Sequence, residues 1–479
     1  MTGILLRGGE LIDPLNRRRG VADLFFDDGR VAAIDDQLTV PRGAQVVDAH
    51  GLLVLPGLVD LRAHVAAPRW HGHRMLARAG VTTALSLCGQ MSEVLDGFWP
   101  AGAGITAGAV AWLMPEQDFG TRDPAAARLA DKVDRSLDSG ALGIQILGGD
   151  EPMTPAATAE AIRIANERHA YVTFNVGSTE QATDLEGMRE AERLAAGRPV
   201  VIGHVNSYCR GTVLSAIDEA QEAVAILTRA PHLRSESYLA LVGAAPGQCV
   251  DGVPVSPATK RLLRTRGYDV SEAGLAQAIL DGEAGVTAEQ GDAVVLLGGE
   301  AGLAYWREHS AAVRLAFPVN DPVAQIVLAT ARHPDGRFVV DALATDGGGI
   351  PRNVTLERGL ALVALEALSL DDLVRKASLV PARLVGLMHK GHLGVGADAD
   401  AVLVDPVGRQ AVATFAAGRP IMRDGIVTGS GGRVLTTQRG ASAVRAAGLE
   451  PEVVDLRLAG HYRPEAIADA YRPVPPVRP

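Results

Sequence analysis

The sequence predicts an α/β protein: a (β/α)8 TIM-like barrel plus a small composite β-sandwich domain made from both chain ends. Three observations predict it. Apolar strand-like runs alternate with helical segments through the middle of the chain, eight such runs can be counted, and further strand-like runs occur at both ends. With 479 residues, the chain is long enough for one large domain and a smaller one.

The barrel strands are expected from short runs rich in β-branched residues. Each is followed by a segment rich in Ala, Glu and Arg with helical spacing, such as AATAEAIRIANERH at 156–169. The eight runs are LVDLRAH, VTTALSL, AVAWLMP, ALGIQIL, YVTFNV, VVIGHVN, LRSESYL and RFVVDALATD, the last at 337–346. In a barrel of this kind, catalytic groups lie at the C-terminal ends of the strands.

The remaining segments predict the domain limits. Strand-like runs separated by glycine and aspartate turns, in residues 1–55 and 390–435, predict the small β-domain. The barrel is expected over residues 56–389. Residues 245–335 form an insertion long enough to be a lid or an interface. Residues 436–479 form a C-terminal extension whose proline-rich end, AYRPVPPVRP, predicts a disordered tail or an extended arm.

Composition excludes several classes of function. The net charge is −10 with no basic run, which is unfavourable for nucleic acid. No apolar run approaches the roughly 20 residues that span a bilayer, and the N-terminus lacks the pattern of a signal peptide. Three scattered cysteines without a CxxC pair are typical of reduced thiols in a cytoplasmic protein.

Six ordered segments together resemble the amidohydrolase superfamily, in its dihydroorotase, hydantoinase and D-aminoacylase branch. They are VLPGLVDLRAH at 54–64, GALGIQILGG at 140–149, VTFNV at 172–176, VIGHVN at 201–206, LATDGGG at 343–349 and the run at 380–406. The resemblance implies a barrel with a small composite sheet. It also implies hydrolysis of cyclic amides, N-acyl groups or related C–N bonds with one or two divalent metals.

The resemblance also implies which positions would hold the metals. Three keep a suitable donor, namely His64, His204 and Asp346. Three are replaced: Arg62 stands for the first histidine, Gln145 for a carbamylated lysine and Asn175 for another histidine.

The replacements have direct chemical consequences. The Arg62 guanidinium has no lone pair to offer a cation, the Gln145 amide cannot form a carbamate, and the Asn175 oxygen is a weak ligand for zinc. We therefore expect no cofactor, with one divalent metal, zinc on His64, His204 and Asp346, as the alternative. We also expect Arg62 to form an ion pair with Asp346, because a buried unpaired carboxylate is costly.

Other side chains are expected near the cavity. Those expected to line it, besides His64, Gln145 and Asn175, are Ser207, Tyr208, Cys209, Arg210, Glu236 and Gly347. A second His-x-His, at His71 and His73, is expected at the start of a helix, where the two side chains point in different directions and do not share a metal.

Three functions remain open from the sequence. The first is a non-catalytic structural or regulatory subunit that partners an active amidohydrolase homologue, or a homo-oligomer. The second is a hydrolase of non-peptide C–N bonds, with Asp346 as general base, His204 polarising the carbonyl and Arg62 stabilising the oxyanion. The third is a sensor that binds a small molecule such as a cyclic amide.

Overall fold

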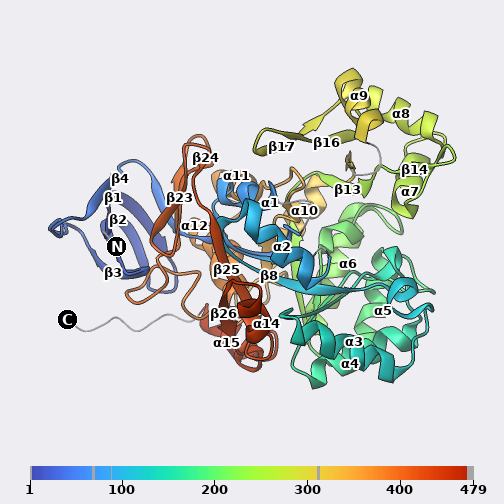
Figure 1. The fold of residues 1–479 in the computed structure, drawn as a ribbon, viewed down its shortest axis with the longest axis horizontal. Helices are drawn as coiled ribbons and strands as arrows, with labels where there is room; N and C mark the ends of the chain where they lie inside the picture. Colours follow the sequence, from blue (N-terminus) through green and yellow to red (C-terminus); the bar gives the residue numbers. More distant parts are fainter. Residues whose placement is uncertain (1–2, 67–70, 88, 310–312, 472–479) are drawn as a thin grey trace.

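A parallel sheet of nine strands, the last two of which together take the eighth barrel position, forms the centre of the protein, in a computed structural model that describes residues 3–66, 71–87, 89–309 and 313–471 (Figure 1). The strands are β6 (Leu58–His64), β7 (Val81–Ser86), β8 (Ala103–Leu113), β9 (Gly143–Ile146), β10 (Tyr171–Phe174), β11 (Val200–Ile202), β12 (Leu233–Tyr238) and β19 (Ala342–Ala344) with β20 (Gly347–Gly348). β19 pairs with β12 while β20 pairs with β6, so this last segment closes the sheet into a barrel. The predicted fold class is confirmed.

A helix follows each barrel strand and covers the outside of the sheet. These helices are α1 (His71–Arg78), α2 (Met91–Ala101), α3 (Ala126–Asp138), α4 (Pro155–Glu167), α5 (Leu185–Ala195), α6 (Ala216–Arg229), α10 (Pro322–Thr330) and α11 (Thr355–Ala364). Local sequence sets several starts: Thr154, Ser215 and Asp321 each accept a hydrogen bond from a backbone N–H of the first helical turn. Two short helices, α12 (Leu370–Val374) and α13 (Val380–Leu384), follow α11.

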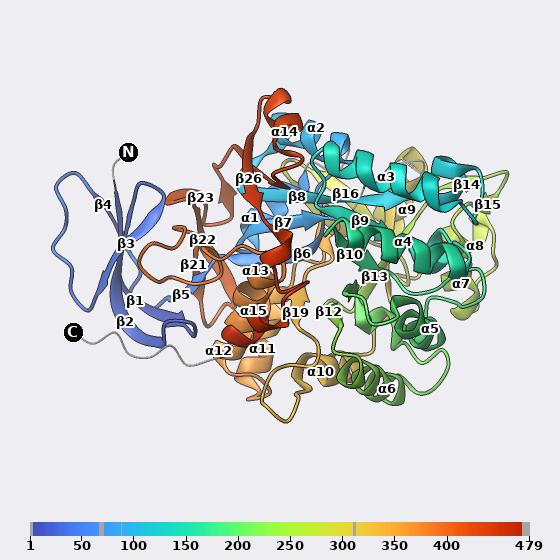
Figure 2. The same cartoon turned by 90° about the horizontal axis from the view of Figure 1, so that it is seen from below.

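A second sheet combines the two ends of the chain and lies at one end of the molecule (Figure 2). Its strands are β1 (Ile4–Asp13), β2 (Arg18–Asp27), β3 (Arg30–Asp35), β4 (Gln45–Asp48), β5 (Leu53–Pro56), β21 (Ala401–Asp405), β22 (Gln410–Ala416), β23 (Arg419–Arg423) and β24 (Ile426–Val427). β5 joins the halves, because it pairs parallel with β1 and antiparallel with β21.

The insertion has a sheet and core of its own and lies away from the small β-domain (Figure 1). It contains β13 (Val242–Pro246), β14 (Cys249–Val250), β15 (Val253–Pro254), α7 (Pro257–Thr265), α8 (Glu272–Leu280), β16 (Gly285–Gln290), β17 (Ala293–Leu297), α9 (Gly299–His309) and β18 (Arg314–Pro318). The β16–β17 hairpin reaches α1, where Asp292 pairs with Arg78 at 2.7 Å and Glu289 lies 3.4 Å from the His71 ring. The insertion therefore contacts the barrel through this hairpin as well as through its two chain connections.

Residues 431–435, expected in the small β-domain, and the C-terminal extension from 436 onward add to the barrel sheet. β25 (Gly431–Thr437) pairs parallel with the first half of β8, and β26 (Glu450–Val454) pairs with β25. Two short helices, α14 (Ala441–Ala446) and α15 (Pro464–Asp469), accompany them. Of the proline-rich end that the sequence predicts as a tail or arm, Ala470 and Tyr471 are described, and residues 472–479 lie outside the described residues.

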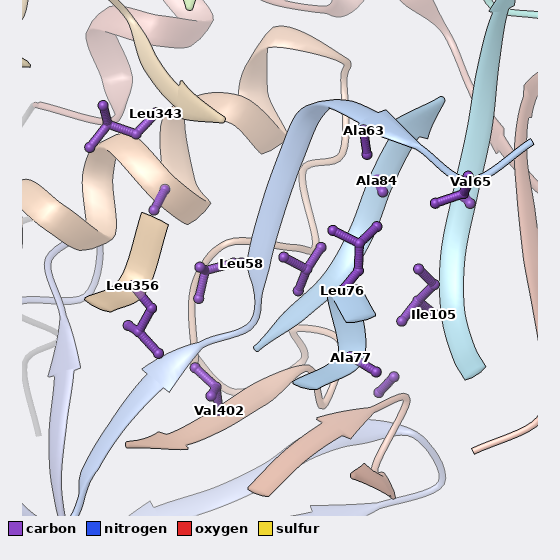
Figure 3. Close-up of a cluster of buried hydrophobic side chains, with 14 of the residues drawn as sticks. Leu58, Ala63, Val65, Leu76, Ala77, Ala84, Ile105, Leu343, Leu356 and Val402 are labelled. Atoms are coloured by element: carbon purple, nitrogen blue, oxygen red, sulfur yellow. The ribbon is translucent and has the colours of Figure 1, made fainter. Parts of the chain in front are cut away.

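Aliphatic side chains join the barrel to the small sheet (Figure 3). Leu58 and Ala63 of β6, Leu76 and Ala77 of α1 and Val402 of β21 belong to one buried cluster. This layer fixes the first barrel strand against both chain ends. Among the described residues, no helix has the length and apolar character needed to cross a bilayer.

A buried charge cluster lies just before β21, with which the chain enters the C-terminal half of the small sheet. Lys390 is 3% exposed, and its Nζ lies 2.9 Å from Asp398 and 2.7 Å from Asp400. The two carboxylates hold the Lys390 pKa above its usual value although burial opposes this. Asp400 also accepts a hydrogen bond from the Ala417 N–H.

We expect Lys390→Met to lower the free energy of unfolding by about 3–5 kcal/mol, because it leaves the buried Asp400 without its cation and Asp398 with Arg30 alone. Denaturant unfolding measures the change. Lys260→Met is the control, since Lys260 has no ion pair within 4 Å among the described residues. Equal effects of both substitutions would contradict the assigned role of Lys390.

Candidate active site

A cavity of about 960 Å³ opens at the C-terminal ends of the barrel strands, with residues of the insertion on its outer side. Eight side chains singled out from the sequence line it: Arg62, His64, Gln145, Asn175, His204, Ser207, Arg210 and Asp346. They come from the ends of β6, β9, β10, β11 and β19, which the barrel brings together around one axis.

Asp346 is held by two partners at the end of β19. Its Oδ1 lies 3.2 Å from His64 Nε2, and its Oδ2 pairs with Arg352 Nη2 at 2.5 Å. Arg352 Nε also donates to the Asp346 carbonyl oxygen. Burial raises the pKa of Asp346, but Arg352, His64 and His204 outweigh it and hold the pKa well below its usual range. Asp346 is therefore an anion in this arrangement.

The expected Arg62–Asp346 ion pair is wrong. Arg62 instead pairs through Nε with Oε1 of Glu236 on β12, and its Nη2 donates to Thr173 Oγ1 at 3.1 Å. Both charged side chains are almost fully buried, at 3% and 1% exposure. The physical reason is that Glu236 faces the barrel interior beside Arg62, while Arg352 already neutralises Asp346.

Glu236 also supports the sixth strand. Its Oε1 accepts from the His204 N–H at 2.8 Å, so one oxygen ties Arg62 to the turn that carries His204. Alternation in LRSESY would have indicated this: Arg234, Glu236 and Tyr238 share one face of the strand. Sequence reasoning treated Glu236 only as a lining residue, and it is absent from the cavity wall.

His204 is a neutral imidazole on a strained backbone. Burial first, then the charge of Arg62, lowers its pKa well below the usual value. Its φ is 36°, and that of Asp346 is 49°, both in the left-handed region that costs non-glycine residues about 1–3 kcal/mol. Nδ1 of His204 and Nδ1 of His64 have no hydrogen-bond partner among the described residues.

Gln145 and Asn175 form a neutral chain across the neighbouring strands. Gln145 Nε2 donates to Asn175 Oδ1 at 3.4 Å, and Trp112 Nε1 donates to Gln145 Oε1 at 3.0 Å. Trp112 was not identified from the sequence because it is not one of the positions that the family resemblance implies. Its position at the end of β8 was the available signal.

Several predicted lining residues lie behind the cavity wall. Tyr208, Cys209 and Gly347, like Glu236, are buried and do not line it. Tyr208 accepts from the Val176 N–H, and burial raises the pKa of Cys209, which keeps it a thiol. The reason is local geometry: a 3-10 turn, Val205–Tyr208, follows His204 and turns only part of this segment toward the cavity.

The second His-x-His does not form a shared site. α1 begins at His71, whose ring contacts the insertion, whereas His73 is fully buried and burial lowers its pKa to about 4. The two side chains point in different directions, as two residues of one helix that are two apart do.

Two imidazoles and one carboxylate, from His64, His204 and Asp346, suit a single zinc ion in their chemistry. Their present arrangement does not yet form a closed ligand set: within the described ranges, no group of three or more His, Cys, Asp or Glu is placed to hold a metal ion. Arg352 on Asp346 Oδ2 is one cause. The replaced positions, Arg62, Gln145 and Asn175, offer no bridging ligand for a second ion.

A buried carboxyl joins the first and last barrel strands below the cavity. Asp60 accepts from the Thr345 hydroxyl and from the N–H groups of Thr345 and Arg62. Burial raises its pKa to about 7, although these hydrogen bonds oppose the rise.

This shift predicts a pH-dependent stability. Because the folded-state pKa of Asp60 exceeds the unfolded value, the folded protein binds more protons between about pH 4 and 7. The free energy of unfolding then falls as pH rises through that window, by up to about 1.4 kcal/mol per pH unit. We expect Asp60→Asn to remove this part of the slope in denaturant unfolding, whereas Asp131→Asn on the surface leaves it. Unchanged slopes in Asp60→Asn would contradict the assignment.

Comparisons with known proteins agree on one family. A family model described as "Amidohydrolase family" matches residues 304–433. An allantoinase of Deinococcus radiodurans is 28% identical over 437 residues, covering 84% of this chain and 86% of that protein. A dihydroorotase of Citrifermentans bemidjiense is 24% identical over 440 residues, covering 84% and 90%.

Solved structures share the fold. A D-aminoacylase has a TM-score of 0.64 and 18% identity, covering 90% of this chain and 99% of that chain. Dihydropyrimidinase from Brevibacillus agri has a TM-score of 0.61 and 16% identity, covering 90% and 98%. N-acyl-D-glutamate deacylase from Bordetella bronchiseptica, in complex with zinc, has a TM-score of 0.63 and 18% identity, with the same coverage.

These relatives correct the expectation that no cofactor is needed. The deacylase was solved with zinc, and D-aminoacylase is described as having a binuclear metal center. An expectation of no cofactor is therefore unsupported, and the alternative of one divalent metal agrees better with them. The family model matches the C-terminal part of the chain, and the allantoinase and dihydroorotase match more than four fifths of its length, so the chain is similar to members of the amidohydrolase superfamily.

Proposed function

We propose that the chain is a hydrolase of non-peptide C–N bonds in small cyclic amides, hydantoin-like compounds or N-acyl compounds. We further propose one divalent metal, zinc, held by His64, His204 and Asp346. The observation that carries the proposal is that these three donors line one cavity at the catalytic end of the barrel. Relatives named as allantoinase and dihydroorotase support this class of reaction.

The residues take distinct roles in this proposal. Zinc would supply Lewis-acid polarisation of the amide carbonyl. His204, kept neutral by burial and by Arg62, can offer a ring nitrogen without competing for a proton near neutral pH. Asp346 accepts a proton from the attacking water and returns it to the leaving nitrogen. The charge of the buried Arg62 is balanced by Glu236, so we assign Arg62 the positioning of the turn that carries His204 instead of oxyanion stabilisation.

Arg352 must release Asp346 for this reaction. While the ion pair holds, the carboxylate has a very low pKa and is a weak base. Departure of Arg352 removes the largest interaction that lowers this pKa, and it frees Oδ2 at the same moment. We therefore assign Arg352 the role of a gate on Asp346.

A second candidate is a non-catalytic structural or regulatory subunit, or a small-molecule sensor. The observation that favours it is that both Asp346 oxygens are already engaged while three metal positions are replaced. A partner would be an active homologue or a second copy of this chain. One structural neighbour, with a TM-score of 0.59, comes from a formyltransferase/hydrolase complex. The few, scattered cysteines favour the cytoplasm for either candidate.

Metal analysis and hydrolysis test the first candidate. We expect about one equivalent of divalent metal per chain in purified protein, with hydrolysis of a hydantoin, a dihydropyrimidine or an N-acyl amino acid. Asp346→Asn should lower kcat/KM by at least about a hundredfold, because it removes the proton acceptor. Asp131→Asn is the matched control on the outer surface.

The opposite outcome selects the second candidate. Protein that holds no stoichiometric metal and cleaves no compound in the panel contradicts the hydrolase. If the same protein then elutes with a second amidohydrolase-like chain, the subunit role is supported instead.

Arg352→Gln tests the gate without measuring activity. Removing the guanidinium frees Asp346 Oδ2 and deletes a positive charge beside the incoming cation, so we expect zinc to bind about tenfold tighter or more. Competition with a chromophoric chelator measures the affinity. Arg229→Gln, which removes an exposed arginine paired with Glu192, is the control. Weaker or unchanged zinc binding in Arg352→Gln would contradict the gate.

A further inference from the structure

A cluster of hydrogen-bond donors occupies one corner of the cavity, apart from the three proposed metal ligands. Its members are Arg210 and Ser207, which follow β11, Tyr238 at the end of β12, and Asn320, which follows β18. The first three line the cavity, and the Asn320 side chain is buried behind them.

Arg210 is anchored entirely by neutral groups. Its Nε donates to Asn320 Oδ1 at 2.9 Å, and its Nη2 donates to Ser207 Oγ at 3.1 Å and Tyr238 Oη at 3.3 Å. Among the described residues, no carboxylate lies within ion-pair distance of Arg210. Both N–H groups of Nη1 are likewise without a protein acceptor there.

A proton count leaves a second donor without an acceptor. Tyr238 Oη accepts from Arg210 Nη2 and from Asn320 Nδ2 at 3.1 Å, so its own hydrogen goes to Ser207 Oγ at 3.3 Å. Ser207 Oγ then accepts from both Tyr238 and Arg210. The Ser207 hydroxyl hydrogen has no acceptor among the described residues.

A second arginine lies beside the corner, and its own charge is paired with Asp346. Arg352 lies with Cζ 5.0 Å from the centre of the Tyr238 ring. Burial raises the pKa of Tyr238, but Arg210 and Arg352 outweigh it and lower the pKa. Asp150, also on the cavity wall, lies beyond ion-pair distance of Arg210 but close enough for Arg210 to oppose the rise that burial causes in the Asp150 pKa.

Gly243 leaves the space that the guanidinium needs. A Cβ at this position would lie 3.0 Å from Arg210 Nη2 and 2.8 Å from a Val319 methyl group. The corner is therefore built by two barrel strand ends and both ends of the insertion, with the arginine held in one orientation.

We propose that this corner binds the carboxylate of the substrate or ligand, with Arg210 Nη1 and the Ser207 hydroxyl as its donors. A partly buried guanidinium with unused donors and no carboxylate within ion-pair distance favours an anionic acceptor, and a carboxylate suits two neighbouring donors. The inference rests on the proposed function for the identity of the rest of the molecule. It selects amides that carry a carboxylate over neutral ones of the same shape.

Acetate and acetamide, which differ in charge but hardly in shape, test the corner directly. We expect NMR titration of the full chain to give acetate an affinity at least about tenfold higher than acetamide. Arg210→Gln should abolish that preference, and Ser207→Ala should weaken acetate binding several-fold. Circular dichroism and thermal melting of both variants check that they fold. Arg229→Gln, which loses the same charge on the outer surface, should leave the preference intact.

The outcomes separate this inference from the proposed function. Equal binding of acetate and acetamide, or a preference that survives Arg210→Gln, overturns the carboxylate site. Tighter, Arg210-dependent binding of inorganic phosphate also overturns it and assigns the corner to phosphorylated ligands. Arg210-dependent acetate binding in a protein that hydrolyses nothing supports the corner and contradicts only the hydrolase.

Discussion

The buried ion pair between Arg62 and Glu236 is the interaction on which the arrangement of the cavity depends. It joins β6 to β12 across the barrel interior, and the same Glu236 oxygen holds the backbone of His204. A buried charge pair is costly to remove from water, so removing either partner would leave the other unpaired in the barrel. Because Glu236 takes Arg62, Asp346 is left for His64 and Arg352. The positive charge that pairs with Asp346 is thus the one on Arg352, at the cavity wall.

The fold could be predicted from the sequence because barrel strands are local signals. Runs such as YVTFNV and VVIGHVN are short, apolar and followed by amphipathic helices. This pattern can be recognised without knowing which residues contact each other. The ends of those strands must then meet around one axis, so the gathering of His64, His204 and Asp346 followed from the fold. Sequence periodicity carries this information because burial and strand direction both follow from the local pattern.

The pairing of charges could not be predicted in the same way. Whether Arg62 meets Asp346 or Glu236 depends on which side chain reaches furthest into the interior, and on the turn that brings Arg352 back over Asp346. Both are properties of three-dimensional packing. Cys209 and Tyr208 show the same limit, because a single 3-10 turn decides which residues after His204 face the cavity. The expectation of no metal was wrong for a different reason. It rested on the number of replaced ligands, whereas this fold holds zinc in another hydrolase.

The pairing of β5 with β21 has a consequence for how the chain reaches this structure. The two strands are separated by more than 340 residues, and β25 likewise pairs with β8 across a long stretch of chain. Closing such long loops is entropically costly and slows folding. During synthesis, one edge of β5 has no hydrogen-bond partner until β21 has left the ribosome. The small sheet can therefore be completed only after β21 has been synthesised.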